Sequence, residues 1–181
     1  MDRPERVSRT FAYGGTVLNI YKDHMVLPDG GEEDYDFIHH NGAAAVIPVM
    51  DDGRIIMVKQ YRNAIDAYTL EIPAGKLDTP DEPTKTAAQR ELEEETGYRA
   101  DEKDISFLLG LYTTVAFCNE KIDIYVADNL IKTQQRLDDD EYIDVEVYSL
   151  DELTDMVYSG KIVDAKTIAG IMAYKVKISQ Q

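Results

Sequence analysis

The chain has 181 residues, of which 44% are apolar and 30% are charged. This length suits one domain, or one domain with a small extension, and is enough to bury a hydrophobic core without covalent staples. The 35 acidic residues outnumber the 19 basic residues and give a net charge of −16. Such a balance disfavours nucleic acid as a partner, because phosphates bind clusters of Lys and Arg, and it equally disfavours an anionic membrane surface.

No apolar run approaches the roughly 18–20 residues of a membrane span, and the residues that follow Met1 do not resemble a signal peptide. The single Cys118 excludes an internal disulfide and a cysteine-based zinc cluster. We therefore expect a cytoplasmic protein without a membrane partner.

The first third of the chain has the pattern of antiparallel strands. Residues 8–40 alternate in part around a turn at Leu27-Pro-Asp-Gly-Gly31, which predicts an antiparallel extension. Two apolar runs, 43–50 and 54–61, flank Asp51-Asp-Gly53, a strong hairpin signal.

A short strand over 68–72 precedes Pro73-Ala-Gly75, and a helix is expected over 83–96. Pro83 suits the first turn of that helix and Gly97 suits its C-terminal end. The later elements are strands over 107–113, 122–127 and 142–148, a helix opened by the capping box Ser149-Leu-Asp-Glu152, and a last helix over 164–177. Because strands and helices mix without strict alternation, we expect a sheet core with helices packed outside.

The helix over 83–96 is unusually acidic near its C-terminal end. At about 100° per residue, Glu91, Glu94 and Glu95 share one side of the helix, beside the apolar Leu92. Glu91 and Glu95 repel each other one turn apart, and the helix dipole disfavours acids in the last turns by about 0.3–1 kcal/mol each. Arg90 offsets only part of this unfavourable energy.

Two interpretations of this acidic segment are open. The first is a solvated acidic face. The second is that Glu91 and Glu95, with Glu94 as a further candidate, bind one or more divalent cations. Carboxylates one turn apart suit Mg²⁺ or Mn²⁺, which prefer oxygen ligands, and such an ion can in turn bind a substrate phosphate.

The segment from Gly75 to Tyr98 resembles the signature of the Nudix hydrolases, G-x5-E-x7-R-E-U-x-E-E-x-G-U, in which U is a bulky apolar residue. The run Arg90-Glu-Leu-Glu-Glu-Glu-Thr-Gly97 matches the fixed positions of its second half. Six residues instead of five separate Gly75 from Glu82. Either Glu82 or Asp81 therefore takes the place of the first glutamate of the signature.

Other segments resemble the ADP-ribose pyrophosphatase branch of this family, namely Gln60-Tyr-Arg62, Leu70-Glu-Ile-Pro-Ala-Gly-Lys-Leu77 and Gly160-Lys-Ile-Val-Asp-Ala-Lys-Thr167. The resemblance implies an α+β fold, an α/β/α sandwich with a mixed central sheet flanked by helices, over residues 43–181. It also implies that residues 1–42 form a β extension that is exchanged between the subunits of a homodimer and completes an adenine site.

The activity implied by the resemblance is hydrolysis of a small-molecule nucleoside diphosphate derivative by attack of water on phosphorus. Bound metal ions neutralise the diphosphate and activate water in such a reaction. By the resemblance, Glu91, Glu95 and the backbone carbonyl of Ala74 are metal ligands. Glu94 is another candidate ligand, and Arg90 orients a glutamate.

The general base of this branch lies on a loop before a late strand. The acidic run Leu137-Asp-Asp-Asp-Glu-Tyr-Ile143 matches that loop in place and character. We expect Glu141 to be the base, with Asp140 as the second candidate. A solvated acidic loop is the alternative.

Three sets of residues are candidates for substrate binding. Arg62 matches a phosphate-binding position, for which the alternative is a salt bridge at a strand end. Glu120 matches a residue that accepts hydrogen bonds from the terminal ribose, for which the alternative is a surface acid. Four side chains of the extension are placed to stack on adenine or simply to pack the sheet: Tyr35, Phe37, His39 and His40.

The segment Thr114-Val-Ala-Phe117 departs from the Ser-Pro-Gly-Phe that is usual in this branch, through Val115 and Ala116. The leading hypothesis is metal-dependent hydrolysis of ADP-ribose to AMP and ribose 5-phosphate, with Mg²⁺ or Mn²⁺ as the cofactor. The departure keeps a second hypothesis open, another nucleoside diphosphate derivative such as the nucleotide sugar GDP-mannose. A third, a non-catalytic Nudix-fold nucleotide sensor, is disfavoured by the acidic residues of the signature.

Overall fold

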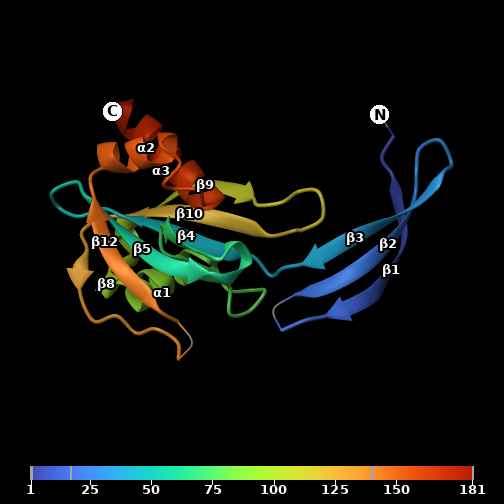
Figure 1. The fold of residues 1–181 in the computed structure, drawn as a ribbon, viewed down its shortest axis with the longest axis horizontal. Coiled ribbons are helices and arrows are strands. Elements are labelled where there is room, and N and C mark those ends of the chain that lie inside the picture. Colours follow the sequence, from blue (N-terminus) through green and yellow to red (C-terminus); the bar gives the residue numbers. More distant parts are fainter. Residues whose placement is uncertain (1, 17, 140, 181) are drawn as a thin grey trace. The chain divides into compact units, whose positions relative to one another are not determined.

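The computed structural model describes residues 2–16, 18–139 and 141–180 (Figure 1). The chain forms two compact units. The first consists of Met1–Gly42 and Tyr112–Lys121, and the second of Ala43–Leu111 and Ile122–Gln181.

The first unit contains a three-stranded antiparallel sheet in the order β1-β2-β3. Its strands are β1 (Glu5–Gly14), β2 (Asn19–Val26) and β3 (Glu32–His39). The turn between β2 and β3 forms at the predicted place, because Gly30 adopts a φ of +85° and the Leu27 N–H donates to the Gly31 carbonyl. The predicted antiparallel extension is therefore confirmed.

The segment Tyr112–Lys121 is joined to the end of β3 within this unit. The backbone N–H of Ile38 donates to the carbonyl of Phe117, at 2.7 Å. The side chain of Asn119 accepts from the N–H of His40 and donates to its carbonyl, at 2.8 and 3.1 Å. This segment carries Glu120, so the extension and the predicted ribose-binding residue belong to one unit.

The second unit contains two larger sheets and one short strand pair. One sheet has the order β7-β4-β10-β9, and it is mixed because β4 runs parallel to β10 and antiparallel to β7. The other has the order β12-β5-β6, and β11 pairs with β8. The strands are β4 (Ala43–Pro48), β5 (Ile55–Arg62), β6 (Ala67–Glu71), β7 (Ala74–Lys76), β8 (Tyr98–Arg99), β9 (Ile105–Tyr112), β10 (Lys121–Ala127), β11 (Ile131–Lys132) and β12 (Ile143–Tyr148).

Three helices complete the second unit: α1 (Thr84–Thr96), α2 (Leu150–Tyr158) and α3 (Ala165–Ser179). They begin and end close to the predicted positions. The Ser149 capping box of α2 forms both of its hydrogen bonds, and Gly97 ends α1 with a φ of +69°.

Strand β4 is buried on both faces and separates two core clusters. Ala45 and Ile47 pack in the cluster that includes Leu153 of α2 and Ile171 of α3. The alternate residues of β4 pack in the cluster that includes Leu92 of α1. Helices therefore cover both sides of the sheet (Figure 1), and the predicted α+β sandwich with a mixed sheet is confirmed.

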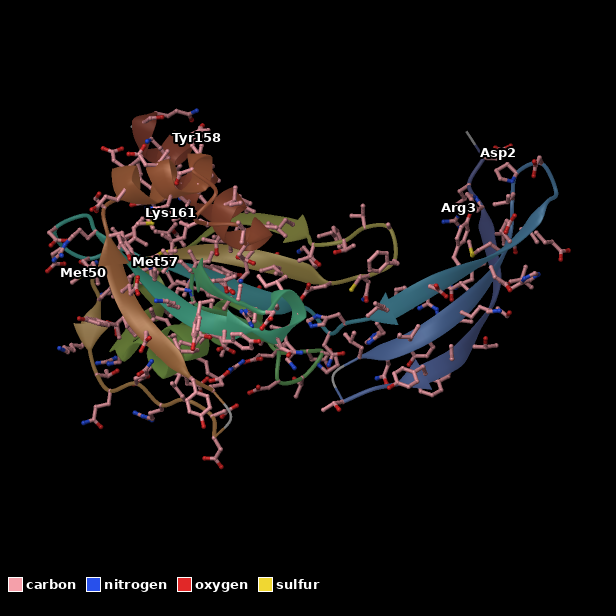
Figure 2. All side chains as sticks on the ribbon, in the orientation of Figure 1. Asp2, Arg3, Met50, Met57, Tyr158 and Lys161 are labelled. Carbon is pink, nitrogen blue, oxygen red and sulfur yellow. The ribbon has the colours of Figure 1, made fainter. Side chains whose placement is uncertain are left out.

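The predicted hairpin around Asp51-Asp-Gly53 is wrong in one respect. The turn forms, but β4 and β5 join different sheets and share only the bridge between Val49 and Ile55. The reason is burial: all of β4 and the first half of β5, including Met57 (Figure 2), lie in the core, so each strand has partners on both sides.

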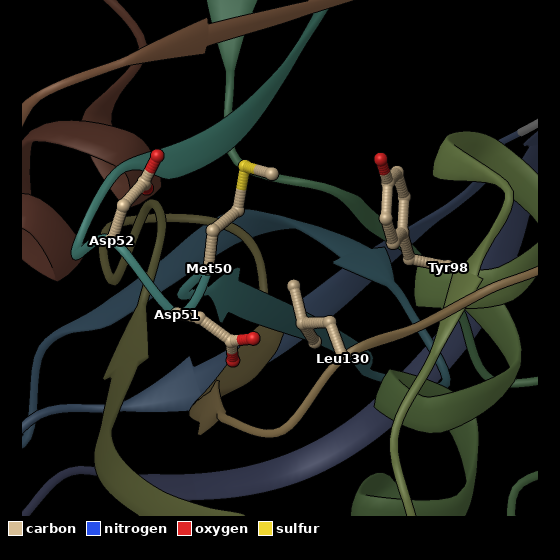
Figure 3. A pocket seen from close by; sticks show the side chains of 5 residues that line it. All are labelled: Met50, Asp51, Asp52, Tyr98 and Leu130. Carbon is tan, nitrogen blue, oxygen red and sulfur yellow. The ribbon is translucent and has the colours of Figure 1, made fainter.

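A pocket of about 180 Å³ opens beside this turn. In Figure 3 its lining side chains come from the turn and from the chain beyond α1; they are Met50, Asp51, Asp52, Tyr98 and Leu130. None of these five is a predicted site residue. In the described part of the chain, no helix has both the length and the apolar character needed to cross a membrane.

Candidate active site

Helix α1 brings two carboxyl groups into the interior of the second unit. Leu92 of α1 is fully buried and marks the side of the helix that faces the core. Glu91 and Glu95 lie next to that side, and they are only 8% and 3% exposed. The helix ends at Gly97, which adopts a left-handed φ of +69°. Only glycine fits there, since a Cβ would lie 2.7 Å from the backbone nitrogen of Gln135. The sequence pattern of the helix therefore places two carboxyl groups one turn apart at positions that are largely shielded from solvent.

Strand β7 lies directly against these carboxyl groups. The N–H of Ala74 donates to Oε2 of Glu95 at 3.0 Å. A Cβ on Gly75 would lie 1.9 Å from Oε1 of Glu91, so only glycine leaves room for that carboxyl group. The start of β7 and the end of α1 together form the walls of the site.

The electrostatics of the site favour a bound cation. Burial raises the pKa of Glu95 to about 8, and the charges of Glu91 and Glu141 add to the rise. Burial likewise raises the pKa of Glu91 to about 7, against the lowering effect of Arg90 and with help from Glu94 and Glu141. Both shifts show that negative charge here is poorly compensated by the protein alone.

The guanidinium of Arg90 contacts several neighbouring carboxylates. Its Nη1 donates to Glu91 at 2.6 Å and to Glu94 at 3.1 Å, and its Nη2 donates to the carbonyl of Lys76 at 3.0 Å. Glu82 also contacts this guanidinium, at 3.4 Å. Despite the extra residue in the preceding loop, Glu82, rather than Asp81, is the acid that the structure places on Arg90.

The donor set fits a hard divalent cation. Among the described residues, no three His, Cys, Asp or Glu side chains already form a group arranged to hold a metal ion. The oxygens of Glu91 and Glu95, and the backbone carbonyl of Ala74, whose N–H contacts Glu95, are nevertheless the ligand types that such cations prefer. A cation there would also offset the burial and the mutual repulsion that together raise the two pKa values.

Glu141 lies in the exposed loop before β12. The N–H of Asp138 contacts its Oε2 at 3.3 Å, and its charge acts on both Glu91 and Glu95. The loop is anchored by Gln135, whose Nε2 donates to the carbonyls of Glu95 and Ile143 at 2.7 and 3.1 Å. The second candidate base, Asp140, lies outside the described residues.

Arg62 ends β5 and forms a bidentate pair with Glu71. Its Nε and Nη2 donate to the two carboxylate oxygens at 2.7 and 2.6 Å. The Glu71 side chain is 2% exposed, whereas that of Arg62 is 42% exposed. The strand-end salt bridge thus exists, and the guanidinium still reaches solvent.

The remaining predicted substrate contacts belong to the first unit. Glu120 accepts from the hydroxyl of Thr113 at 2.7 Å and lies 3.4 Å from Nε2 of His40. Tyr35 is exposed. The ring of Phe37 packs between those of Tyr21 and His39, with centroid distances of 6.2 and 6.3 Å.

One face of Phe37 is already covered. The guanidinium of Arg9 lies 3.5 Å from the centre of the Phe37 ring, and it also donates to the buried Asp23 through Nε and Nη2, both at 2.6 Å. Tyr35 is therefore the more open of the two rings predicted to stack on adenine.

A buried polar cluster around Glu71 was not predicted. Lys166 Nζ donates to Glu71 and, at 3.0 Å, to Asp164, while the Ile72 N–H donates to Thr167 Oγ1 at 3.0 Å. The sequence does carry a signal: Lys166 falls in the first turn of α3, where the helix dipole disfavours a cation. An unfavourable charge at a helix end points to a tertiary partner.

The family model described as "NUDIX domain" matches residues 39–169. A protein of Bacillus subtilis (strain 168), named ADP-ribose pyrophosphatase, is 36% identical over 177 residues, which cover 97% of this chain and 94% of that protein. A protein of Bacillus methanolicus, named methanol dehydrogenase activator, is 37% identical over 161 residues, which cover 88% of this chain and 85% of that protein.

A solved structure described as "Crystal structure of ADP compounds hydrolase" shares the fold, with a TM-score of 0.88 and 21% identity, over 100% of this chain and 97% of that chain. The match of the family model covers most of the chain, and it includes the acidic helix and the strand that faces it. The chain therefore belongs to the Nudix hydrolase family.

Proposed function

We propose that the chain is a metal-dependent pyrophosphatase that hydrolyses ADP-ribose to AMP and ribose 5-phosphate. The observation that carries the proposal is the buried pair Glu91 and Glu95 facing Ala74 and Gly75, a site with hard oxygen donors and too little positive charge. The names of relatives that align with almost the whole chain support the choice of substrate.

Nudix hydrolases generally use divalent metals, and we propose Mg²⁺ here, with Mn²⁺ as a substitute. Glu91, Glu95 and the Ala74 carbonyl would hold the ion, with Glu94 as an additional ligand. When bound, the ion supplies positive charge for the diphosphate and lowers the pKa of a water ligand. Glu141 would accept the proton of the attacking water as the water oxygen bonds to one phosphorus. The bridging P–O bond would break, with its electron pair leaving on the phosphate of the other product.

The substrate contacts follow from the same proposal. Arg62 binds a phosphate through the part of its guanidinium that reaches solvent. Glu120 accepts hydrogen bonds from ribose hydroxyls, and Tyr35 and Phe37 stack on adenine. The exposure of the Tyr35 side chain and the 42% exposure of the Arg62 side chain support these roles.

The test is a substrate panel with Mg²⁺. Release of AMP and ribose 5-phosphate from ADP-ribose is expected to be faster than cleavage of GDP-mannose at equal concentrations. GDP-mannose is included because Val115 and Ala116 depart from the residues usual in the ADP-ribose branch. Val115 is 82% exposed in the loop that carries Glu120, where it could contact a substrate. A preference for the sugar nucleotide would replace the proposed substrate, and binding of nucleotide without cleavage would favour a sensor.

Gly75→Ala is expected to lower kcat by about 100-fold, because the new Cβ displaces the Glu91 carboxyl group by the order of 1 Å. The unfolding free energy should change by less than about 1 kcal/mol, since the atom displaced is the end of a flexible side chain. Steady-state kinetics and urea unfolding measure the two effects.

Gly31→Ala is the control for that variant. Gly31 lies in the first unit, whereas the acidic helix belongs to the second. The nearest neighbour of a Cβ added there is the side chain of Asp29, at 3.2 Å. Its kcat should stay within about twofold of the wild type. Equal kcat values for the wild type and Gly75→Ala would show that the Glu91 position does not matter for the reaction.

We also propose that the protein is a homodimer of the cytoplasm, formed through the first unit. Every residue of β1 is exposed, and three of them are large and apolar: Val7, Phe11 and Tyr13. Exposed large apolar side chains that gather on one element are typical of interaction surfaces. The lone free Cys118 is compatible with a reducing compartment.

Phe11→Asp is expected to weaken the dimer by at least about tenfold in its dissociation constant, because aromatic anchors dominate such interfaces. Sedimentation equilibrium over a range of protein concentrations measures this change. Asp29→Asn, in the turn between β2 and β3, serves as the control and should leave the constant unchanged. A wild-type chain that sediments only as a monomer would refute the homodimer.

A further inference from the structure

The cluster of buried Glu71, buried Lys166 and partly exposed Arg62 contains more polar and charged groups than the stability of this region requires. Glu71 accepts two hydrogen bonds from Arg62, a third from Lys166 and a fourth from the hydroxyl of Thr69 at 2.6 Å. Burying such a set carries a desolvation penalty, and apolar residues of similar volume often stabilise a protein equally well. Stability alone therefore gives a weak reason for this arrangement.

The geometry of Arg62 supplies a stronger reason. Its pair with Glu71 uses the Nε and one Nη2 hydrogen, two of the five N–H donors of a guanidinium. The Arg62 side chain is 42% exposed, so it reaches solvent although Glu71 is buried. Glu71 thus fixes one edge of Arg62 and leaves the three N–H donors that it does not use for a ligand.

The chain itself brings Arg62 near the carboxylate site. Its partner Glu71 lies three residues before Ala74, whose N–H donates to Glu95 at 3.0 Å. Three residues span at most about 11 Å. An anion held beside Glu95 by a cation would therefore lie near Glu71 and the guanidinium that Glu71 binds.

Lys166 connects the cluster to a rigid element. Its Nζ donates to both Glu71 and Asp164, and Asp164 is the N-cap of α3. Asp164 also accepts from the N–H and the hydroxyl of Thr167, at 2.9 and 2.6 Å. The position of Glu71, and with it the direction of Arg62, is consequently set by the start of α3 as well as by β6.

We infer that Glu71 is a positioning residue for substrate binding: together with Lys166 it aims the remaining N–H donors of Arg62 at a phosphate of the diphosphate substrate. The inference rests on the proposed function, since it assigns the ligand of Arg62. Glu71 itself does not touch the substrate. It removes rotational freedom from Arg62 before the substrate arrives, and this reduces the entropic loss on binding.

Glu71→Gln tests this inference, because it keeps the shape of the side chain and removes the charge that holds the guanidinium. The KM for ADP-ribose is expected to rise by about 10- to 100-fold, the size associated with one charged hydrogen bond, while kcat changes by less than about twofold. Asp52→Asn breaks the exposed Asp52–Arg54 pair, at 2.8 Å, and is the matched control with unchanged KM and kcat.

A double-mutant cycle separates positioning from general damage. Arg62→Met should raise KM by itself, and adding Glu71→Gln to it should raise KM by less than about twofold more, because Glu71 acts only through Arg62. Full additivity of the two effects would overturn the inference. So would a Glu71→Gln variant that lowers kcat and leaves KM unchanged.

Binding of ADP provides a readout that does not depend on turnover. In calorimetry with Mg²⁺, the dissociation constant for ADP is expected to rise in Glu71→Gln by the same factor as KM. If the wild type fails to hydrolyse ADP-ribose, the proposed function fails while the ADP measurement still tests Glu71. If Glu71→Gln does not fold, Glu71→Asp replaces it, since a side chain shorter by one methylene misdirects Arg62 and must show the same rise. An unchanged dissociation constant would overturn the inference.

Discussion

Glu95→Gln is expected to lower the kcat for ADP-ribose hydrolysis by more than about 100-fold, since the loss of even an outer partner of a metal ligand lowers activity by about 10- to 100-fold. Glu95 is 3% exposed and accepts from the Ala74 N–H, so its oxygens are held in place and water cannot take over their role. The amide keeps the size of the side chain but removes the negative charge that attracts a cation. Steady-state turnover with Mg²⁺ measures the loss.

Glu93→Gln is the matched control, because it is on the same helix but faces Arg136 at 3.5 Å instead of the site. Its kcat should stay within about twofold of the wild type. Calorimetric titration with Mn²⁺ should show weaker uptake for Glu95→Gln alone. Robust turnover by that variant would remove Glu95 from the metal site.

Metal-free protein is expected to be less stable at about pH 8.5 than at about pH 5.5, by the order of a few kcal/mol. The folded-state pKa values of Glu91 and Glu95, about 7 and about 8, lie above the ordinary value of 4.5. The folded state therefore binds more protons than the unfolded state between these limits, and stability falls as the pH rises from about 4.5 to about 8.

Mg²⁺ should reverse this loss, because it binds the ionised carboxylates of the folded chain. The increase in the urea midpoint on adding Mg²⁺ is expected to be larger at about pH 8.5 than at about pH 5.5. The double variant Glu91→Gln/Glu95→Gln isolates the effect, since it should lose both the pH slope and the response to Mg²⁺. A wild type with the same response at both pH values would contradict the account.

The local features of the acidic helix could be predicted from sequence because they depend on neighbouring residues. Its start at Pro83, its end at Gly97 and the inward side that carries Glu91 follow from backbone preferences and from helical periodicity. The antiparallel extension and the capping box at Ser149 are of the same kind.

Other features could not be predicted because they depend on residues far apart in the sequence. Lys166 meets Glu71 across 95 positions, and Asn119 meets His40 across 79. Local signals at Asp51-Asp-Gly53 predict the turn correctly, but they do not reveal that the two flanking strands are buried and belong to different sheets. Tertiary packing overrides local preference in each case.

The two hydrogen bonds of Gln135 have a consequence for the proposed base. One carboxamide holds the end of α1 at Glu95 and the start of β12 at Ile143, so Gln135 and Ile143 are held close together. Holding two points of a chain together removes conformational entropy in advance. Glu141 is two residues from the anchor at Ile143, so its backbone is confined to within roughly 7 Å of that anchor.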